Sequence, residues 1–401
     1  MPNPLEKTSI ILGVTGSIAS YKAVDLASKL SQSGAFVDVV MTNEAAKFVA
    51  PLAFQSITHR PVITELFNPT SEIGIDHVAL AKRADVIVVA PATANMIAKM
   101  AFGMTDDALT ATILASKAPV IVCPAMDGHM YENAATQSNI KVLKDRGVIV
   151  VGPVEGHLAS GLTGIGRMVD LDEIEGCLKQ RLGKNGDLKA RRIVVSAGGT
   201  QESIDPVRFI SNHSSGKMGY AIAEAARDRG AEVVMVAAPN SLRDPVGVNV
   251  VSTISADEMK SAIEAEVEDA DALIMAAAVA DWKPKTLAHQ KIKKNPSSNT
   301  WAVQLVKTPD LLAGVNRSGL IKVGFAAETE DIVVNAKSKI AAKNLDFIVA
   351  NDITDPCGGF GSATSQVTIL DKNGDCEELP LLSKYEVGHR ILDKVAILLT
   401  P

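Results

Sequence analysis

The sequence has little that would suggest a metal site, a disulfide framework or a membrane span. Its four cysteines are scattered through 401 residues, without the CxxC spacing of zinc ligands or redox motifs. No apolar run approaches the roughly 20 residues that a membrane-spanning helix needs, and Met1–Lys7 shows no apolar segment of a secretory signal. These absences predict a reduced, cytoplasmic protein that does not act on membranes.

An excess of positive charge is also missing. The chain has 40 Lys and Arg against 46 Asp and Glu, and its formal net charge of −6 argues against nucleic acid as a general partner. Hydrophobic residues make up 47% of the chain and charged residues 21%, which is typical of a globular protein with a sizeable core. Because the chain is long for one domain, we expect two.

Strand and helix patterns alternate in the first half. Apolar and β-branched runs predict strands at Thr8–Val14, Ala35–Met41, Asp85–Ala90, Pro119–Cys123 and Val148–Val151. Helical spacing predicts helices over Ile18–Ser33, Ala92–Phe102, Asp127–Arg146 and Leu171–Leu182. Residues 152–167 contain five glycines and no period, which predicts a mobile flap. The polar stretch Gly183–Asp187 separates the halves, and we expect domains over residues 1–189 and 190–401.

The alternation restarts in the second half. Strands are predicted at Arg192–Ser196, Glu232–Ala237, Ala272–Ala277, Lys322–Ala326 and Phe347–Ala350. Helices are predicted over Gly216–Arg229, Ala256–Val267 and Asp331–Asn344. Gln366–Leu370 and Glu377–Leu381 predict an antiparallel pair around a turn that contains Asn-Gly. The fold class is therefore α/β, with two doubly wound, Rossmann-like three-layer domains.

The segment Ser196–Gly219 is the most informative part of the chain. It joins a strand pattern to a helix pattern and contains two adjacent glycines, several hydroxyls, Arg208 and Lys217. A loop of this kind at a helix N-terminus suits an anion, because small residues expose backbone N–H groups and the cations neutralise charge. The alternative is an ordinary strand-to-helix loop with a serine cap.

Three segments of the first half contain candidate binding residues. Gly16 and Ser17 stand at a predicted helix N-terminus, where they suit a phosphate. Thr93 and Asn95 open a helix after a buried strand and could hold a polar ring edge or a ribityl hydroxyl. His77 lies near another helix start. Each has a structural alternative: a capped helix, or a histidine that only supports the fold.

Together these segments resemble the flavoproteins that decarboxylate a peptidyl or pantothenoyl cysteine. The motifs Gly-x-Thr-Gly-Ser-Ile-Ala, Asp-His before Leu-Ala, and Ala-Pro-Ala-Thr-Ala-Asn recur there and bind FMN, and the resemblance covers nearly all of residues 8–182. It implies a flavodoxin-like fold and a role for His77 as catalytic base or hydrogen-bond partner at the thiol being oxidised. The FMN-lining residues that it implies are Gly16, Ser17, Thr42, Thr93 and Asn95.

Two positions depart from that family's pattern. Asp127 stands where the family has an Asn that grips the substrate carboxylate, and Ser160 stands where it has a Cys that donates a proton. An ionised Asp127 would repel the substrate. We therefore expect it to be protonated or turned to its helix N-terminus, with His129 or Arg167 meeting the carboxylate. With these changes we still expect decarboxylation.

Further segments of the second half suggest a nucleotide site. Asp281 follows a buried strand, and Lys291–Lys294 places three cations in four residues. Lys339 and Lys343 are spaced i, i+4 and project from one helical face. The alternative for both basic groups is a solvated surface.

This half resembles the phosphopantothenate–cysteine ligase domain across residues 190–401. The segments Ile210–Gly219, Ala-Ala-Val-Ala-Asp281, Lys-Ile-Lys-Lys294, Gly-Phe-Ala-Ala-Glu-Thr329 and Lys-Asn-Leu-Asp346 fall in that family's order. The resemblance implies that Arg208 and Asn212 act at an acyl-cytidylate intermediate. The CTP-binding residues that it implies are Asp281, Lys291, Pro309, Asp310, Leu311, Leu312, Phe325, Lys339 and Lys343. Because a carboxylate must approach a triphosphate, Mg²⁺ is expected, although the sequence does not identify its ligands.

The two resemblances together imply a bifunctional enzyme of coenzyme A biosynthesis. CTP, cysteine and 4'-phosphopantothenate would give phosphopantothenoylcysteine, which the flavin half would decarboxylate to 4'-phosphopantetheine. The resemblance also implies a homo-oligomer, a dodecamer built from trimers and dimers. Two alternatives stay open: a flavin-binding regulatory protein, and an active ligase with a catalytically silent flavin half. The former predicts a degraded flavin site or a long acidic tail, and the sequence has neither.

Overall fold

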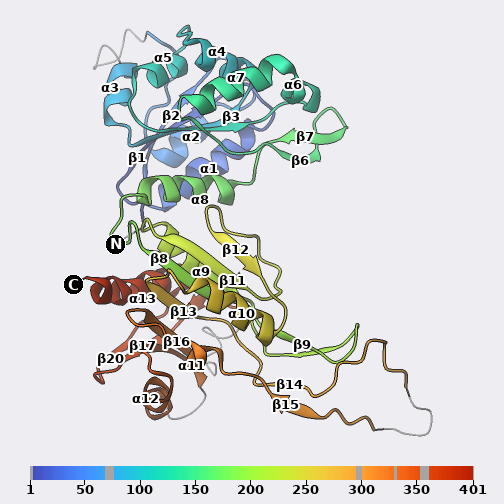
Figure 1. The fold of residues 1–401 in the computed structure, drawn as a ribbon. Coiled ribbons are helices and arrows are strands. Elements are labelled where there is room, and N and C mark those ends of the chain that lie inside the picture. The colour runs from blue at the N-terminus through green and yellow to red at the C-terminus, as the bar shows by residue number, and fades with distance from the viewer. Residues whose placement is uncertain (1–2, 68–75, 295–299, 329–331, 353–360, 401) are drawn as a thin grey trace. The chain divides into compact units, whose positions relative to one another are not determined.

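The computed structural model describes residues 3–67, 76–294, 300–328, 332–352 and 361–400. The chain divides into two compact units, Pro2–Leu182 and Gly183–Pro401 (Figure 1). Each unit is built around one main sheet of its own, parallel in the first unit and mostly parallel in the second. Along the described ranges, no helix combines the length and the apolar character that crossing a membrane requires.

The first unit contains a five-stranded parallel sheet in the order β2-β1-β3-β4-β5. Its strands are β1 (Ser9–Val14), β2 (Phe36–Met41), β3 (Val86–Ala92), β4 (Val120–Pro124) and β5 (Ile149–Val150). Every residue of β3 is buried, as expected for a strand covered on both faces. This is the flavodoxin-like order, and its topological switch point lies between β1 and β3.

The helices of the first unit follow the strands that they connect. They are α1 (Ser20–Gln32), the 3-10 helix η1 (Ala45–Lys47), α2 (Pro51–Thr58), α3 (Asp76–Arg83), α4 (Ala94–Phe102), α5 (Ala108–Ala115), α6 (Gly128–Glu132), α7 (Ala134–Asp145) and α8 (Leu171–Gly183). The single helix expected over Asp127–Arg146 is wrong, because the chain breaks at Asn133. The Asn133 side chain accepts a hydrogen bond from the Ala135 N–H at 2.9 Å and begins a new helix.

The glycine-rich segment 152–167 is also more regular than expected. It forms an antiparallel hairpin of β6 (Val154–His157) and β7 (Thr163–Arg167) instead of an aperiodic flap. Gly166 allows this hairpin to lie against the loop after β4, since a Cβ there would stand 2.2 Å from the Met126 carbonyl oxygen. The Met126 N–H donates to the Gly166 carbonyl oxygen at 3.0 Å. The glycines therefore permit close packing.

The second unit contains an eight-stranded sheet in the order β12-β11-β8-β13-β16-β17-β19-β20. Its strands are β8 (Arg192–Ala197), β11 (Glu232–Ala237), β12 (Asn249–Ser252), β13 (Ala272–Met275), β16 (Ile321–Glu328), β17 (Phe347–Asp352), β19 (Val367–Asp371) and β20 (Cys376–Glu378). The first six are parallel, and β19 and β20 add the expected antiparallel hairpin. Numbered in chain order, the parallel strands run 3-2-1-4-5-6, the Rossmann order, with its switch point between β8 and β13.

Helices cover both faces of this sheet. One apolar cluster joins the sheet to α9 (Lys217–Arg227) and α13 (Lys384–Leu399). The other joins it to α10 (Ala256–Glu266), α11 (Leu311–Gly314) and α12 (Ile332–Lys343). The three-layer architecture predicted from the sequence is confirmed.

Short strand pairs stand outside the main sheets. Three pairs of the second unit are β9 (Gln201–Ser203) with β10 (Phe209–Ser211), β14 (Trp282–Pro284) with β15 (Leu305–Lys307), and β18 (Thr364–Ser365) with β21 (Leu382–Ser383). In Figure 1, β14 and β15 form an arm that extends from the sheet, with β9 beside it. β9 and β10 follow β8 in the chain, and β14 and β15 follow β13, so these four strands extend from the two switch-point loops.

Candidate functional site

In the first unit, the loops after β1, β3 and β4 meet at the switch point. The buried Thr15 hydroxyl donates to the Pro91 carbonyl oxygen at 2.7 Å and accepts from the Thr93 N–H at 3.0 Å. The Ala125 N–H donates to the Ala92 carbonyl oxygen at 2.9 Å, which adds the loop after β4. Sequence reasoning missed Thr15, although a hydroxyl directly before Gly16 at a strand end was a usable signal.

Gly16, Ser17 and Thr42 lie together beside this junction. A Cβ on Gly16 would stand 2.4 Å from the Glu44 Cβ, so only glycine fits against the loop after β2. The Thr42 N–H donates to the Val14 carbonyl oxygen at 3.0 Å, and the Thr42 side chain is buried. The half-buried Ser17 hydroxyl accepts from the Ala19 N–H at 3.3 Å. These residues form a close-packed turn at the N-terminus of α1, which is suitable for an anionic group.

Thr93 and Asn95 lie at the start of α4. The Thr93 side chain caps the helix by accepting from the Met96 N–H at 3.2 Å, so it has the structural role that the alternative interpretation gave it. Asn95 is exposed on the first turn. Asn95 is therefore the better placed of the two for binding a polar ring edge.

His77 is the second residue of α3 and is partly exposed. Its Nδ1 atom is buried and makes no hydrogen bond within the described residues. Buried polar atoms nearly always have a partner. This imidazole nitrogen is thus able to accept or donate a hydrogen bond to a bound group.

Asp127 and Ser160, the two departures from the family pattern, contact each other. The Ser160 hydroxyl donates to Asp127 Oδ2 at 2.8 Å, and Asp127 Oδ1 accepts from the His129 N–H at 3.0 Å as the N-cap of α6. These two hydrogen bonds lower the pKa of Asp127. Of the two expected arrangements, the structure shows the one in which the Asp127 carboxyl turns to its helix N-terminus.

Arg167 and His129, the two groups expected to meet a substrate carboxylate, differ in whether they are already paired. Arg167 on β7 pairs with Asp170 at 3.2 Å, and His129 is exposed on α6. A flavin fits the described features of this edge. Gly16 lets the turn at the N-terminus of α1 pack against the loop after β2, Asn95 is exposed, and His77 Nδ1 is buried without a hydrogen-bond partner among the described residues.

In the second unit, the switch point is closed by hydrogen bonds between the loops after β8 and β13. The Ser196 hydroxyl accepts from the Ala277 N–H at 3.1 Å, and the buried Thr200 hydroxyl accepts from the Ala280 N–H at 3.0 Å. Gly198 has φ +84°, and a Cβ there would stand 2.7 Å from the Ala238 carbonyl oxygen. The sequence analysis did not single out Ser196 and Thr200 individually. They fix the ends of the two strands relative to each other.

Asn212 and Lys217 lie in the chain segment from β8 to the start of α9, which follows the same switch point. The exposed Asn212 donates from Nδ2 to the Val279 carbonyl oxygen at 3.0 Å, just beyond β13. Lys217 begins α9 and donates to the Gly361 carbonyl oxygen at 2.5 Å. The predicted anion loop therefore lies at the carboxyl ends of the strands, where α/β sheets bind ligands.

The expected nucleotide residues form two local groups. Asp281 has an exposed side chain, and its carbonyl oxygen accepts from the Thr308 N–H at 3.0 Å, which brings Pro309 near it. Asp310 caps α11 and pairs with Lys343 at 2.9 Å. Burial by itself raises the pKa of Asp310, but the hydrogen bond from Lys343 and other contacts outweigh it, so the pKa is lowered. Lys343 is therefore partly neutralised by a carboxylate.

The remaining residues expected to bind CTP differ in whether their side chains are accessible. The Leu311 and Leu312 side chains are buried in the core, so only their backbone groups could face a nucleotide. Phe325 on β16 is partly buried, and Lys339 lies one turn before Lys343 on α12. Lys291 is exposed on the segment that Arg208 contacts.

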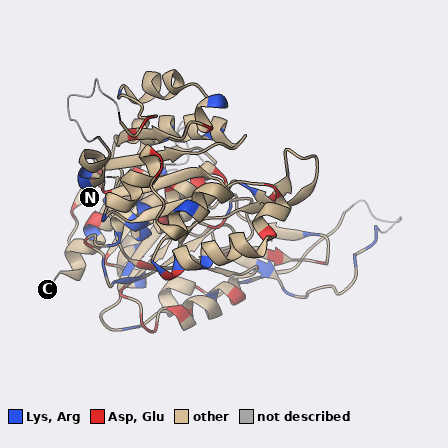
Figure 2. Cartoon of the chain, turned by 90° about the horizontal axis from the view of Figure 1, so that it is seen from above, with Lys and Arg blue, Asp and Glu red and all other residues tan. Residues whose placement is uncertain are grey.

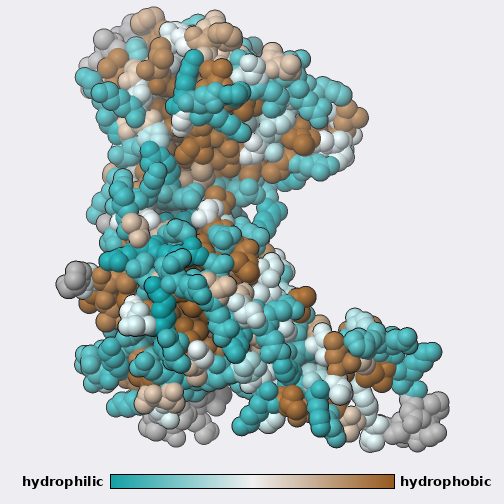
Figure 3. Space-filling view, viewed as in Figure 1, coloured by the Kyte–Doolittle hydropathy of each residue, from teal (hydrophilic) through white to brown (hydrophobic). Residues whose placement is uncertain are grey.

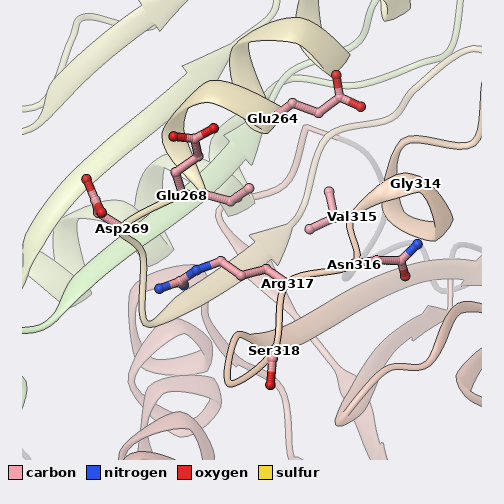
Figure 4. A pocket seen from close by; sticks show the side chains of 9 residues that line it. Glu264, Glu268, Asp269, Gly314, Val315, Asn316, Arg317 and Ser318 are labelled. Carbon is pink, nitrogen blue, oxygen red and sulfur yellow. The ribbon is translucent and has the colours of Figure 1, made fainter.

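A cavity of about 630 Å³ lies elsewhere in the second unit (Figure 4). It is lined by the end of α10 and the loop before β16, with Glu264, Glu268, Asp269 and Arg317 among its residues. This is the amino end of the parallel strands, opposite the switch point. The described residues contain no group of three or more His, Cys, Asp or Glu side chains able to hold a metal ion.

Comparisons with known proteins agree with this two-part organisation. Residues 1–183 match a family model described as "Flavoprotein", and residues 188–398 match the DNA/pantothenate metabolism flavoprotein C-terminal domain. The coenzyme A biosynthesis bifunctional protein CoaBC of Vibrio vulnificus (strain YJ016) is 44% identical over 393 residues, which are 97% of this chain and 98% of that protein. The CoaBC of Bacillus subtilis (strain 168) is 44% identical over 399 residues, 98% of each.

A solved structure of the C-terminal domain of a CoaBC protein is 39% identical and covers 53% of this chain and 98% of that one, with a TM-score of 0.46.

The fold, the site residues and the two family matches define a two-domain α/β protein with a flavoprotein half. More particularly, the chain belongs to the family of coenzyme A biosynthesis bifunctional proteins CoaBC.

Proposed function

We propose that this chain catalyses two consecutive steps of coenzyme A biosynthesis. The second unit joins cysteine to 4'-phosphopantothenate, and the first unit decarboxylates the product to 4'-phosphopantetheine. The observation that carries the proposal is that each doubly wound unit has its candidate residues at its own switch point, in a chain that matches bifunctional relatives over nearly its full length. We place the functional domains at residues 1–189 and 190–401.

For the ligase, we propose CTP as the activating nucleotide, with Mg²⁺ bound mainly by the triphosphate. The substrate carboxylate attacks the α-phosphorus, pyrophosphate leaves, and the cysteine amine then displaces CMP from the acyl-cytidylate. Lys291, Lys339 and Lys343 cancel the repulsion between carboxylate and triphosphate. Asp281, Phe325 and the loop from Pro309 to Leu312 complete the nucleotide site.

Asn212 is proposed to act at the acyl intermediate. Its amide is exposed and held by the Val279 carbonyl oxygen at the strand end. An uncharged donor there can orient the acyl carbonyl for attack by the cysteine amine without adding charge.

For the decarboxylase, we propose FMN as the bound flavin, which would supply the two-electron oxidation of the substrate thiol. Gly16, Ser17 and Thr42 would hold its phosphate end, and Thr93 and Asn95 its ring or ribityl edge. His77 would take the thiol proton at Nδ1, which has no hydrogen-bond partner among the described residues. Asp127 and Ser160 act as a pair, in which Ser160 keeps the carboxylate turned to the helix N-terminus and away from the substrate.

We also propose that the chain acts as a cytoplasmic homo-oligomer, a dodecamer in its complete form. Large hydrophobic side chains exposed on the first unit support association, and Figure 3 shows brown surface on both units. Examples are Tyr21, Leu52, Phe67 and Phe102, each more than 60% exposed. Light scattering of the purified chain measures the assembly mass.

Two measurements on the purified chain test the proposal. A visible flavin absorbance band is expected to accompany the protein through gel filtration. Pyrophosphate release is expected only when CTP, 4'-phosphopantothenate and Mg²⁺ are all present. Ligase turnover without flavin reduction by phosphopantothenoylcysteine would support the silent-domain alternative. The absence of both activities would contradict the assignment.

A further inference from the structure

A buried carboxylate lies beneath the basic segment Lys291–Lys294. Asp205 has a fully buried side chain that forms an ion pair with Arg208. Its Oδ1 accepts from the Val207 and Arg208 N–H groups, each at 2.9 Å, and its Oδ2 accepts from Arg208 Nε at 3.0 Å. The carboxylate is thus saturated by donors from its own turn and by one further donor.

That further donor comes from the basic segment. The Ile292 N–H donates to Asp205 Oδ2 at 3.1 Å, and the Ile292 carbonyl oxygen accepts from Arg208 Nη2 at 2.8 Å. Both polar backbone groups of Ile292 are therefore bound by one side-chain ion pair. Residues 291–294 belong to no strand, so this pair supplies the bonds that a neighbouring strand would otherwise provide.

Two more contacts hold the same turn against the arm. The Arg208 guanidinium lies over the Trp301 ring at 4.5 Å from its centroid, and the Ala288 N–H donates to the Ile204 carbonyl oxygen at 3.1 Å. The turn 204–208 is thereby joined to the arm on both sides of the segment. Meanwhile Lys291, Lys293 and Lys294 are exposed, and Figure 2 shows basic residues along the long loop of this unit.

From these contacts we propose that Asp205 and Arg208, the Asp205–Arg208 clamp, are positioning residues that hold the lysines of segment 291–294 in place for the nucleotide. Arg208 then acts on the nucleotide site through Ile292, since its Nη2 binds the Ile292 carbonyl oxygen while its Nε binds Asp205. The pair is electrically neutral as a unit, so it orders the lysines without adding to their charge. This inference rests on the ligase function proposed above.

Limited proteolysis of the full chain tests the clamp without requiring activity. Trypsin cleaves after exposed lysines when the segment opens locally. In Asp205→Asn and in Arg208→Gln, the rate of cleavage after Lys291, Lys293 and Lys294 is expected to rise by about tenfold, as for loss of a charge-assisted hydrogen bond. Trp301→Leu, a surface change that leaves the buried carboxylate in place, is expected to give a smaller rise in the same direction.

Asp271→Asn is the matched control. Asp271 also binds an arginine and a backbone N–H, Arg191 at 3.0 Å and the Arg192 N–H at 2.8 Å, but at the amino ends of the central strands β8 and β13. Cleavage after the three lysines is expected to be unchanged in this variant, even if it lowers the melting temperature.

Ligase kinetics provide the second readout. Both clamp variants are expected to raise the KM for CTP by about tenfold with a smaller change in kcat, as for lost ground-state positioning. Accumulated acyl-cytidylate in Arg208→Gln, with normal cleavage in Asp205→Asn, would overturn the proposal in favour of direct contact. If the unmodified chain shows no ligase activity, the proposed function fails, while the cleavage result still decides whether the clamp exists.

Discussion

At the scale of single residues, the candidate side chains differ in whether the fold already uses their polar groups. Thr93 and Asp310 cap helices, and Arg208 is bound on several sides, so these residues shape the site. Lys291 is exposed on a segment without regular structure, and Asn95 is exposed on the first turn of α4. Exposed groups of this kind are the ones available to a ligand, and substituting them should change chemistry more than stability.

Lys291→Gln is expected to lower ligation at least tenfold and to leave flavin content unchanged. The substitution removes a positive charge opposite the triphosphate, and a charge-assisted contact of about 1.5–3 kcal/mol corresponds to roughly ten- to a hundredfold. Pyrophosphate release at fixed CTP measures the effect. Lys260→Gln, which changes a partly exposed lysine of α10, is the control. Near-normal turnover of Lys291→Gln would mean that the basic segment is only a solvated surface and does not bind the nucleotide.

Asn212→Asp is expected to accumulate the acyl-cytidylate. A carboxylate cannot donate to the Val279 carbonyl oxygen as the amide does, and its charge would repel the intermediate. Rapid quench with labelled CTP detects the accumulated species. A large rise in the KM for CTP with no intermediate would instead assign Asn212 to nucleotide binding.

Ser160→Ala is expected to move the acid limb of flavin reduction to higher pH. The Ser160 hydroxyl donates to the Asp127 carboxylate and lowers its pKa, so removing it raises that pKa and protonates Asp127 at a higher pH. Stopped-flow flavin reduction by phosphopantothenoylcysteine across acidic pH measures the shift. The exposed Ser138→Ala on α7 serves as the control. An unchanged acid limb would mean that protonation of Asp127 does not affect flavin reduction.

At the scale of elements, the β6–β7 hairpin and the loop after β4 form one packed unit. Gly166 meets the Met126 carbonyl oxygen, and the Ser160 hydroxyl reaches Asp127 from the hairpin tip. The hairpin therefore brings Ser160 to the end of β4, where the first unit has its candidate catalytic groups.

Gly166→Ala is expected to destabilise the first unit by about 1–3 kcal/mol, as for other overpacked sites, and to weaken decarboxylation. A Cβ at Gly166 would lie 2.2 Å from a backbone oxygen that cannot move freely. Denaturant unfolding and CO₂ release measure the two effects. Gly164→Ala on the same strand is the control, because its Cβ would make an ordinary 3.9 Å contact with Leu158. Equal stability of the two variants would contradict this packing account.

Elements were predictable from the sequence where burial is complete. Strands such as β3 and β11 are continuous apolar runs, and their bounds were found to within two residues at each end. The hairpin was missed because its strands are short, half-exposed and rich in glycine. No element was proposed over α13, although Ser383 and Glu386 form a capping box that could have revealed it.

The candidate site was only partly predictable for a different reason. Motif residues such as Gly16 and Asn212 lie within continuous segments that the resemblance identifies. The contacts of Asp205 with Ile292, and of Ser160 with Asp127, join positions 87 and 33 residues apart. No local pattern encodes such pairs, so they require the folded chain.

At the scale of the whole molecule, two complete α/β units with separate switch points account for a chain with two activities. The phosphopantothenoylcysteine made by the second unit is the compound that the first unit would decarboxylate. Each unit has its own apolar core and its own set of site residues, so substitutions in one should leave the other active.

The central claim is that one chain performs both steps despite Asp127 and Ser160. The most direct measurement is to incubate the purified protein with 4'-phosphopantothenate, cysteine, CTP and Mg²⁺, and to follow pyrophosphate, phosphopantothenoylcysteine, CO₂ and 4'-phosphopantetheine over time. We predict equal final amounts of pyrophosphate, CO₂ and 4'-phosphopantetheine, with phosphopantothenoylcysteine rising and then falling. Accumulation of phosphopantothenoylcysteine without CO₂ would contradict the claim.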